Sequence, residues 1–290
     1  MFPAKFEYVA PSSVAEALSL LQQGDGDAKI VAGGHSLLPL MKLRLAQPRL
    51  LIDIGRIADL RFIRVEGDRL VIGALTTYRD LLQSEDVHRT MPVLAEAAHE
   101  IGDNQVRARG TLAGSLAHAD PAADMPAVVL ALGGSVHAVG PNGERDYQVE
   151  DFFVDMLTTQ LDEHEIITQV SLPIPGPDTG SDYQKFDQPA SHYALCGVCA
   201  LVTLGADGKI ASARLGVTGV STKAYRPTEV EQALAGLNVN EDAVRTAVQS
   251  VADGVDVQGD IHASPDYRAH LARVLTRRAV LAAAQRAHTR

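Results

Sequence analysis

Two short segments rich in glycine and hydroxyl side chains have the residue types that can hold a phosphate group. In the first, residues 31–39 (VAGGHSLLP), Gly33 and Gly34 permit positive φ angles, so that successive backbone N–H groups can converge on one oxyanion. Ser36 would add a hydroxyl donor. A tight turn between a strand and a helix explains the same residues, because Gly-Gly turns are common. The segment has neither the Gly-Lys-Ser/Thr of a Walker loop nor the Gly-x-Gly-x-x-Gly of a Rossmann fold.

The second segment, residues 109–124 (RGTLAGSLAHADPAAD), places the hydroxyls of Thr111 and Ser115 on either side of Gly114, which suits a pyrophosphate. Asp124 could accept hydrogen bonds from the hydroxyls of a ribose or ribityl chain. The alternative is that the acidic residues only turn the chain and cap a helix that begins near Met125. Two such loops, each expected to follow a strand, favour a bound dinucleotide.

The remaining candidates for chemistry have simpler explanations. Cys196 and Cys199 form a Cys-x-x-Cys within an apolar, strand-like stretch, and residues three apart in a strand point to opposite faces. We therefore expect two buried free cysteines. The ten histidines form no recognisable ligand set, so no metal site is predicted. His35 and His118 lie in the two segments, but no base constellation accompanies them, and no catalytic residue is assigned.

The elements that must position these segments can be read from periodicity and turn residues. Ser13 and Glu16 have the spacing of a capping box at the start of a helix, which Gly24 ends. Residues 28–32 are typical of a strand that leads into the first segment. The pattern also predicts strands at 50–54, 62–65, 70–72, 135–139 and 165–172, and helices at 77–82, 92–101 and 125–132.

Three prolines within residues 173–177 oppose both helix and central strand and indicate a domain boundary near residues 173–180. Beyond it, residues 193–204 and 210–217 are typical of an antiparallel hairpin. Three helices follow, which begin at Thr228, near Asp242 and at Ser264-Pro265. The fold class is therefore α+β in both parts.

Composition narrows the class of protein. The 290 residues include 46% hydrophobic and 21% charged side chains, as in ordinary soluble proteins. The net charge of −10 argues against a surface for nucleic acid or anionic membranes. No signal peptide or transmembrane stretch is recognised, so we expect a cytoplasmic protein. The arginines of the last predicted helix are interpreted as a solvated face that pairs with acidic neighbours, with a subunit contact as the alternative.

Several separated motifs resemble one known family along essentially the whole chain. They are AGGHSLLP at 32–39 with MKLR at 41–44, VIGALTT at 71–77, VRxRGT at 106–111 continuing to Asp124, YxKF at 183–186, and YRxxL at 267–271 with RRA at 277–279. Their order is that of the FAD-binding medium subunit of molybdenum hydroxylases. The aerobic carbon monoxide dehydrogenase type is the closer resemblance, and the flavin domain of xanthine dehydrogenase is the more distant one.

The resemblance implies a two-part FAD-binding domain of the vanillyl-alcohol-oxidase (PCMH) type at residues 1–175, with subdomains at about 1–55 and 56–175. A smaller α+β domain of the CO dehydrogenase flavoprotein type, an antiparallel sheet with helices, would follow at 180–290. No metal site is implied on this chain. The cofactor-binding residues implied are Ile30, Val31, Ala32, Gly33, Gly34, His35, Ser36, Leu37, Ile101, Thr111, Ala113, Gly114, Ser115, Asp124, Ile167, Lys185 and Tyr193.

The parts of this set have different implied roles. The first and second segments would enclose the FAD pyrophosphate, Asp124 would bind the ribityl or ribose side, and Ile101 and Ile167 would line the cofactor. Lys185 would lie near the flavin and Tyr193 against the isoalloxazine ring. Ala113 departs from the family, which usually has glycine there. A methyl group is tolerated if φ at Ala113 is negative, whereas a positive φ would require a rebuilt loop.

The implied function is electron transfer within a heterotrimer. A small subunit would carry two [2Fe–2S] clusters and a large subunit the molybdenum cofactor, because two cysteines cannot hold a cluster on this chain. Electrons would pass through FAD to an external acceptor, and the complex would be a dimer of heterotrimers. Contact with the inner face of the membrane would come only through the complex. Two alternatives remain: a non-catalytic nucleotide-binding scaffold, which Ala113 and the scarce aromatic residues favour, and a stand-alone flavin oxidoreductase.

Overall fold

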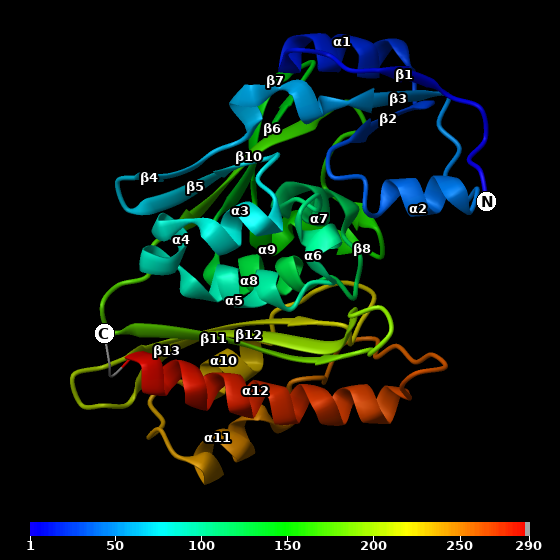
Figure 1. The fold of residues 1–290 in the computed structure, drawn as a ribbon. Helices are drawn as coiled ribbons and strands as arrows, with labels where there is room; N and C mark the ends of the chain where they lie inside the picture. The colour runs from blue at the N-terminus through cyan, green and yellow to red at the C-terminus, as the bar shows by residue number, and fades with distance from the viewer. Residues whose placement is uncertain (288–290) are drawn as a thin grey trace.

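A small parallel sheet forms the N-terminal part of the molecule, at the top of Figure 1. The computed structural model describes residues 1–287, so the last three residues of the predicted C-terminal domain lie outside the described residues. In the sheet, β3 (Leu50–Asp53) pairs in parallel with β1 (Glu7–Val9) on one side and with β2 (Ala28–Val31) on the other. Parallel neighbours need a crossover, and α1 (Val14–Gln23) supplies it between β1 and β2. After β2 comes α2 (Leu37–Lys42).

The capping pattern that starts α1 is met in part. Ser13 caps the helix by accepting a hydrogen bond from the backbone N–H of Glu16 at 3.2 Å. The Glu16 carboxylate accepts from the backbone N–H of Ser12 at 2.9 Å rather than from that of Ser13. The predicted reciprocal capping box is therefore wrong in its second half. Gly24 ends the helix as predicted.

A five-stranded antiparallel sheet forms the middle of the chain. Its order is β4 (Ile63–Glu66), β5 (Arg69–Gly73), β10 (Ile166–Pro173), β6 (Ser135–Gly140) and β7 (Gly143–Gln148). The predicted hairpin at 62–65 and 70–72 is confirmed as β4 and β5. The helices of this part are α3 (Tyr78–Gln83), α4 (Glu85–Thr90), α5 (Pro92–His99), α6 (Asn104–Arg107), α7 (Leu112–His118), α8 (Asp124–Leu132) and α9 (Val149–Phe152).

The shorter pieces of the chain complete this description. They are the strands β8 (Phe153–Asp155) and β9 (Thr158–Thr159), and the 3-10 helices η1 (Ile54–Arg56), η2 (Ala58–Leu60) and η3 (Val248–Ser250).

A third sheet begins after the proline-rich connection. It is an antiparallel meander of β11 (Thr179–Asp187), β12 (Ala194–Leu204) and β13 (Ile210–Thr218), which confirms the predicted hairpin. Figure 1 shows α5 and α8 above this sheet and α12 (Pro265–Ala287) below it. Because both faces are covered, almost every residue of β12 is buried.

The two cysteines show the two faces of this sheet directly. Cys196 packs in the hydrophobic cluster that includes the side chains of α12, and Cys199 packs in the cluster of α5 and α8. Both are free and buried, as predicted, and their side chains diverge from the strand. At Gly216 of β13, a Cβ atom would lie 1.8 Å from the carbonyl oxygen of Ala127 in α8, so only glycine permits this close helix–sheet contact.

The C-terminal helices correct one expectation. After β13 come α10 (Thr228–Leu234) and α11 (Glu241–Ala247), and the predicted second helix is divided into α11 and η3. On α12, Arg277 pairs with Glu241 at 3.2 Å and Arg286 with Glu96 at 2.8 Å, as the solvated-face interpretation predicts. Arg268 departs from it, because it is buried and pairs with Asp260 at 2.7 Å.

The segment expected to be a loop at residues 109–124 contains the helix α7. The helix α6 ends just before it, so the second glycine-rich segment follows a helix and not a strand. β1 and β11 were also missed. β1 has three residues, and the apolar alternation of β11 is interrupted by Gly180 and Asp182. The remaining predicted strands and helices are present within a few residues of their expected bounds, which confirms the α+β class.

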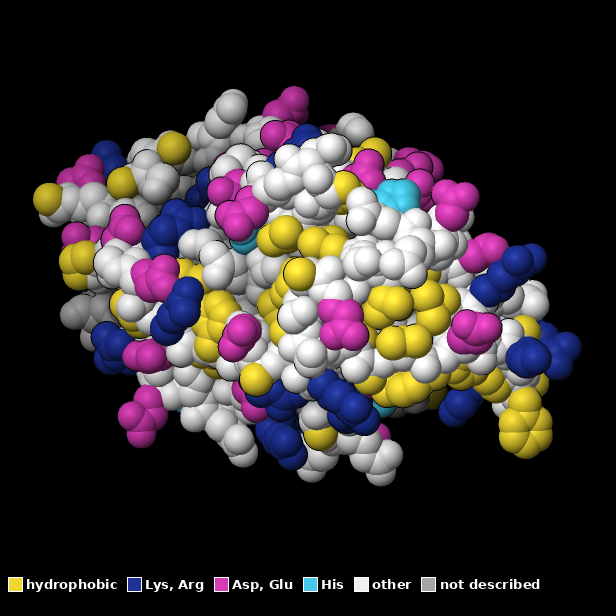
Figure 2. Space-filling view, turned by 90° about the horizontal axis from the view of Figure 1, so that it is seen from above, with side chains coloured by type: hydrophobic (Ala, Val, Ile, Leu, Met, Phe, Trp, Pro, Cys, Tyr) yellow, Lys and Arg dark blue, Asp and Glu magenta, His cyan; other side chains and the backbone are white. Residues whose placement is uncertain are grey.

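The face of the molecule that carries α1 has hydrophobic, acidic and basic side chains side by side. Figure 2 shows hydrophobic side chains in small groups between acidic and basic ones, rather than in one continuous patch. Among the described residues, no helix combines the length and apolar character needed to span a bilayer.

Candidate functional site

The first glycine-rich loop connects β2 to α2 and leaves polar groups open. Gly34 has a φ of +75°, as a glycine nest requires. Ser36 occupies the position before α2 without capping it, and its hydroxyl has no hydrogen-bond partner within the described residues. Val31 is buried at the end of β2, and Ile30 packs against the core beneath α1. The other residues of this loop, Ala32, His35 and Leu37, are partly or fully exposed.

The two predicted segments meet along their backbones. A Cβ atom on Gly33 would lie 2.1 Å from the carbonyl oxygen of Arg109, so the main chains are in direct contact there. One residue pair adds a polar contact, because Nε2 of His35 lies 3.2 Å from the carbonyl oxygen of Gln105. The fold therefore brings the two segments, far apart in the sequence, to one surface.

The start of the second segment is hydrogen-bonded to the chain around the start of α3. The backbone N–H of Tyr78 donates to the carbonyl of Gly110 at 3.0 Å, and the N–H of Leu112 donates to the carbonyl of Thr76 at 3.2 Å. Thr111 caps α7, its hydroxyl accepting from the N–H of Gly114 at 3.1 Å. Burial raises the pKa of Tyr78, and a hydrogen bond with the Ser115 hydroxyl opposes that rise.

Ala113 lies in the first turn of α7 with an ordinary helical backbone. Because its φ is not positive, the extra methyl group leaves the turn intact and no rebuilt loop is needed. The side chain is buried beneath the segment. The departure at Ala113 therefore gives no support to a scaffold that has lost its ligand.

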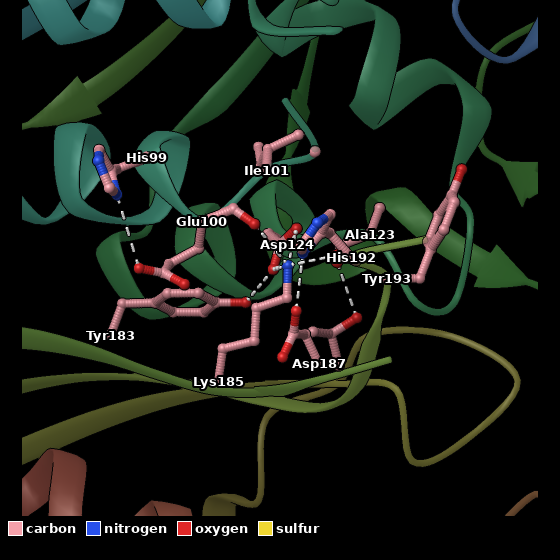
Figure 3. A network of polar contacts seen from close by, with 12 residues as sticks. His99, Glu100, Ile101, Ala123, Asp124, Tyr183, Lys185, Asp187, His192 and Tyr193 are labelled. Atoms are coloured by element: carbon pink, nitrogen blue, oxygen red, sulfur yellow. Dashed lines mark hydrogen bonds and ion pairs between the residues drawn. The ribbon is translucent and has the colours of Figure 1, made fainter. Parts of the chain in front are cut away.

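Asp124 begins α8 and lies in a buried polar network (Figure 3). The Tyr183 hydroxyl donates to its Oδ1 at 2.5 Å, and Nζ of Lys185 lies 2.9 Å from Oδ1 and 3.1 Å from Oδ2. Burial raises the pKa of Asp124, and the ammonium group of Lys185 and the Tyr183 hydroxyl oppose the rise. The carboxylate is thus already bound by its own chain, so a ribityl or ribose hydroxyl would have to share it.

The other implied residues lie around this network. Ile101 is half-buried directly after α5, and Tyr193 is 44% exposed directly before β12. Figure 3 shows the Tyr193 ring at the far side of the network, away from Lys185. Ile167 lies in β10, is 7% exposed and packs in the core beneath α7.

Two positioning residues escaped the sequence reasoning. The buried Thr218 hydroxyl lies 2.8 Å from the carbonyl oxygens of both Pro121 and Ala123, and it fixes the chain just before Asp124. Tyr183 shares a strand face with Lys185, because the two are two residues apart in β11. That spacing was readable from the sequence, whereas nothing local to Thr218 indicates its partners.

Two surface pockets lie away from the two glycine-rich segments. One of about 430 Å³ lies between α1 and the five-stranded sheet, and one of about 360 Å³ lies beside the proline-rich connection. Neither is lined by a residue of the two segments. We place the site at the segments, since that is where open donors and positive-φ backbone coincide. The described residues include no group of three or more His, Cys, Asp and Glu side chains placed to hold a metal ion.

The donors of the two segments fit a flavin dinucleotide. The open Ser36 hydroxyl and the backbone around Gly34 can donate to phosphate oxygens. In the second segment, Ser115 carries a hydroxyl in the first turns of α7. FAD, when bound, supplies the redox chemistry, while the protein supplies position and electrostatics.

Comparisons with known proteins agree with this fit. Residues 4–175 match the family of the FAD binding domain in molybdopterin dehydrogenase, and residues 181–283 match the CO dehydrogenase flavoprotein C-terminal domain. The carbon monoxide dehydrogenase medium chain of Hydrogenophaga pseudoflava is 40% identical, over 98% of both chains. The glyceraldehyde dehydrogenase medium chain of Sulfolobus acidocaldarius is 35% identical, over 96% of this chain and 98% of that one.

Solved structures extend the likeness to three dimensions. Carbon monoxide dehydrogenase from Hydrogenophaga pseudoflava superposes with a TM-score of 0.95 at 40% identity, over 99% of both chains. Quinoline 2-oxidoreductase from Pseudomonas putida superposes with a TM-score of 0.93 at 32% identity, also over 99% of both chains. The predicted family is confirmed, and so is the fold class of an FAD-binding domain with a CO dehydrogenase flavoprotein C-terminal domain. The chain therefore belongs to the FAD-binding medium subunits of the molybdenum hydroxylase family and is an FAD-dependent oxidoreductase subunit.

Proposed function

We propose that this chain is the electron-transferring subunit of a heterotrimeric molybdenum hydroxylase. It would receive electrons from [2Fe–2S] clusters on a small subunit, next to a large subunit with the molybdenum cofactor, and deliver them to an external acceptor. The chain matches medium chains along their whole length, and its two cysteines lie on opposite faces of β12, where they cannot share a cluster. A dimer of heterotrimers in the cytoplasm is the proposed assembly.

One observation carries the proposed FAD site: the backbone contact between Gly33 and Arg109 joins the two donor-bearing segments. On this basis residues 30–37 and 111–115 would bind the pyrophosphate of FAD. The segments that carry Ile101, Asp124 and Tyr193 would border the flavin end, with Ile167 behind α7. The proposed domain division follows the proline-rich connection, with the FAD-binding domain at 1–175 and the second domain from 180.

The substrate of the complex would be bound by the large subunit and not by this chain. Relatives of similar identity are named for carbon monoxide and glyceraldehyde, which share little chemistry. The large subunit would therefore distinguish one substrate from another, and we assign no residue of this chain to substrate recognition.

The test is to purify the assembled complex and follow its flavin absorbance while its substrate is added without an acceptor. Electron transfer through this chain predicts that the flavin band bleaches and returns when an acceptor is supplied. A band that stays unchanged would identify a scaffold, and turnover by the isolated chain would identify a stand-alone oxidoreductase. A complex that holds no flavin on this subunit would refute the proposal outright.

A further inference from the structure

Lys185 joins three segments that are separate in the sequence. Its side chain is 2% exposed, and its Nζ contacts the carbonyl oxygen of Glu100 at 2.9 Å, the carboxylate of Asp124 at 2.9 Å and the carbonyl oxygen of His192 at 2.7 Å. These acceptors come from the end of α5, the start of α8 and the loop between β11 and β12. Figure 3 shows the lysine rising from β11 into the middle of them.

The three acceptors adjoin the three residues proposed to border the flavin end. Glu100 precedes Ile101, His192 precedes Tyr193, and Asp124 is itself one of the three. An ammonium group has three N–H donors, and the three acceptors of Lys185 use all of them. No donor is left for a ligand.

We propose that Lys185 is a positioning residue that fixes the three flavin-bordering segments relative to one another, and that it does not bind the cofactor directly. The identity of that cofactor rests on the proposed function above, whereas the tether itself is a property of the chain without a ligand. A direct ligand would turn a donor outward, but this one is enclosed and fully satisfied.

The surroundings explain why a lysine is needed. Removing the ammonium group would leave the Asp124 carboxylate buried with the Tyr183 hydroxyl as its one remaining side-chain donor among the described residues, and two carbonyl groups would lose their lysine partner. Breaking a buried ion pair by removing one partner is strongly destabilising, because the remaining charge is uncompensated. The segments ending at Glu100 and His192 would then be released while the sheet beneath them stays paired.

The experiment is hydrogen–deuterium exchange on the full chain freed of flavin, comparing wild type with Lys185→Met. The tether predicts that backbone amides at 100–102 and 188–194 exchange at least about tenfold faster in the variant, with the β12–β13 hairpin unchanged. Lys209→Met is the matched control, because Lys209 is an exposed lysine in the turn of that hairpin. Tyr183→Phe removes one donor to Asp124 but keeps the three lysine contacts, so both segments should stay protected.

Direct ligation predicts a different result. If Lys185 served only the cofactor, flavin-free Lys185→Met would exchange like wild type, and that outcome would overturn the proposal. If circular dichroism shows that the Lys185→Met variant is unfolded, the Lys185→Gln variant is used in its place. Global loss of structure in both variants would also overturn it, since a tether predicts local loosening. Because no flavin is present, a failure of FAD binding in a separate titration would refute only the proposed function.

Discussion

The two segments of the proposed FAD site are built in opposite ways. The first, between β2 and α2, is mostly half-buried or exposed, and its Ser36 hydroxyl has no partner within the described residues. The end of the second segment is fixed by side chains of the third sheet, from β11 and β13. Thr218 holds the carbonyls of Pro121 and Ala123, and Tyr183 and Lys185 hold Asp124.

The difference separates two tasks. Groups of the first segment remain free to donate to a ligand, so binding should order them. The end of the second segment is ordered on folding, so the entropy of fixing it is lost before any ligand arrives. Changes in the first segment should therefore act on FAD affinity, and changes that release the second should act first on stability.

The largest effect is expected where the two segments touch. In Gly33→Val the new Cβ would meet the carbonyl of Arg109 at 2.1 Å, and backbone cannot move aside as a flexible side chain can. Gly34→Val would force a β-branched residue to a φ of +75°. Both variants should lose FAD completely, as measured by flavin absorbance per purified chain. Gly176→Ala is the control, since nothing lies within 4 Å of its new Cβ; normal FAD content in both valine variants would contradict the proposed nest.

The second-largest effect is expected from a substitution that frees the end of the second segment. Thr218→Val keeps the side-chain shape but removes the hydroxyl that serves Pro121 and Ala123. The Pro121 carbonyl still accepts from the backbone N–H of Gly219 at 2.7 Å, but the Ala123 carbonyl loses the hydroxyl. This loss should lower the free energy of unfolding by about 1–3 kcal/mol in urea titrations without flavin. Thr246→Val, at an exposed helix position, should cause little change. An equal loss in both variants would show that the fixed end of the segment has no special role.

Ser36→Ala tests the open segment directly. Because the hydroxyl has no partner in the described residues, the flavin-free variant should unfold like wild type. Loss of one hydrogen bond to a phosphate oxygen should weaken FAD binding by about 0.5–1.5 kcal/mol, measured by fluorescence titration. The comparison between the segments would fail if this variant lost stability and kept its FAD affinity.

The smallest expected effect is a pH-dependent change in stability at α6, the helix just before the second segment. Asp103 caps α6, and the backbone N–H of Val106, followed by that of Gln105, lowers the pKa of the Asp103 carboxyl. A lowered folded pKa contributes stability above the ordinary aspartate pKa, and this contribution is lost as the pH falls through the folded value. Asp103→Asn keeps a capping oxygen but does not titrate. The stability difference between wild type and variant should therefore shrink on acidification, and a constant difference in thermal unfolding from neutral to acid pH would contradict this.

Local patterns were enough to predict much of the fold. Alternation and turn residues predicted the hairpin of β12 and β13, and strand geometry predicted that Cys196 and Cys199 face opposite sides. The helix α8 was predicted from its apolar run. These features depend on neighbours in the sequence, so one chain is sufficient to recognise them.

The missed features depend on distant partners or weak local signals. α7 is made largely of Gly, Ala and Ser, whose pattern is that of a loop, and packing against α8 and β10 holds it as a helix. The contact of Gly33 with Arg109 joins segments that no local pattern relates. The motif resemblance predicted a set of residues near the flavin, but the three acceptors of Lys185 appear only once β11, α5 and α8 are packed together.

The opposed cysteines of β12 have a practical consequence for measuring this molecule. Burial raises the pKa of Cys196 to about 12 and raises the pKa of Cys199 as well, so at neutral pH both are enclosed thiols with almost no thiolate to react. A cysteine introduced at an exposed position such as Ala190, in the loop before Tyr193, would then be the single reactive thiol of the chain. Spin or fluorescent labels could be attached there without removing either native cysteine, and the motion of that loop could be followed as subunits assemble.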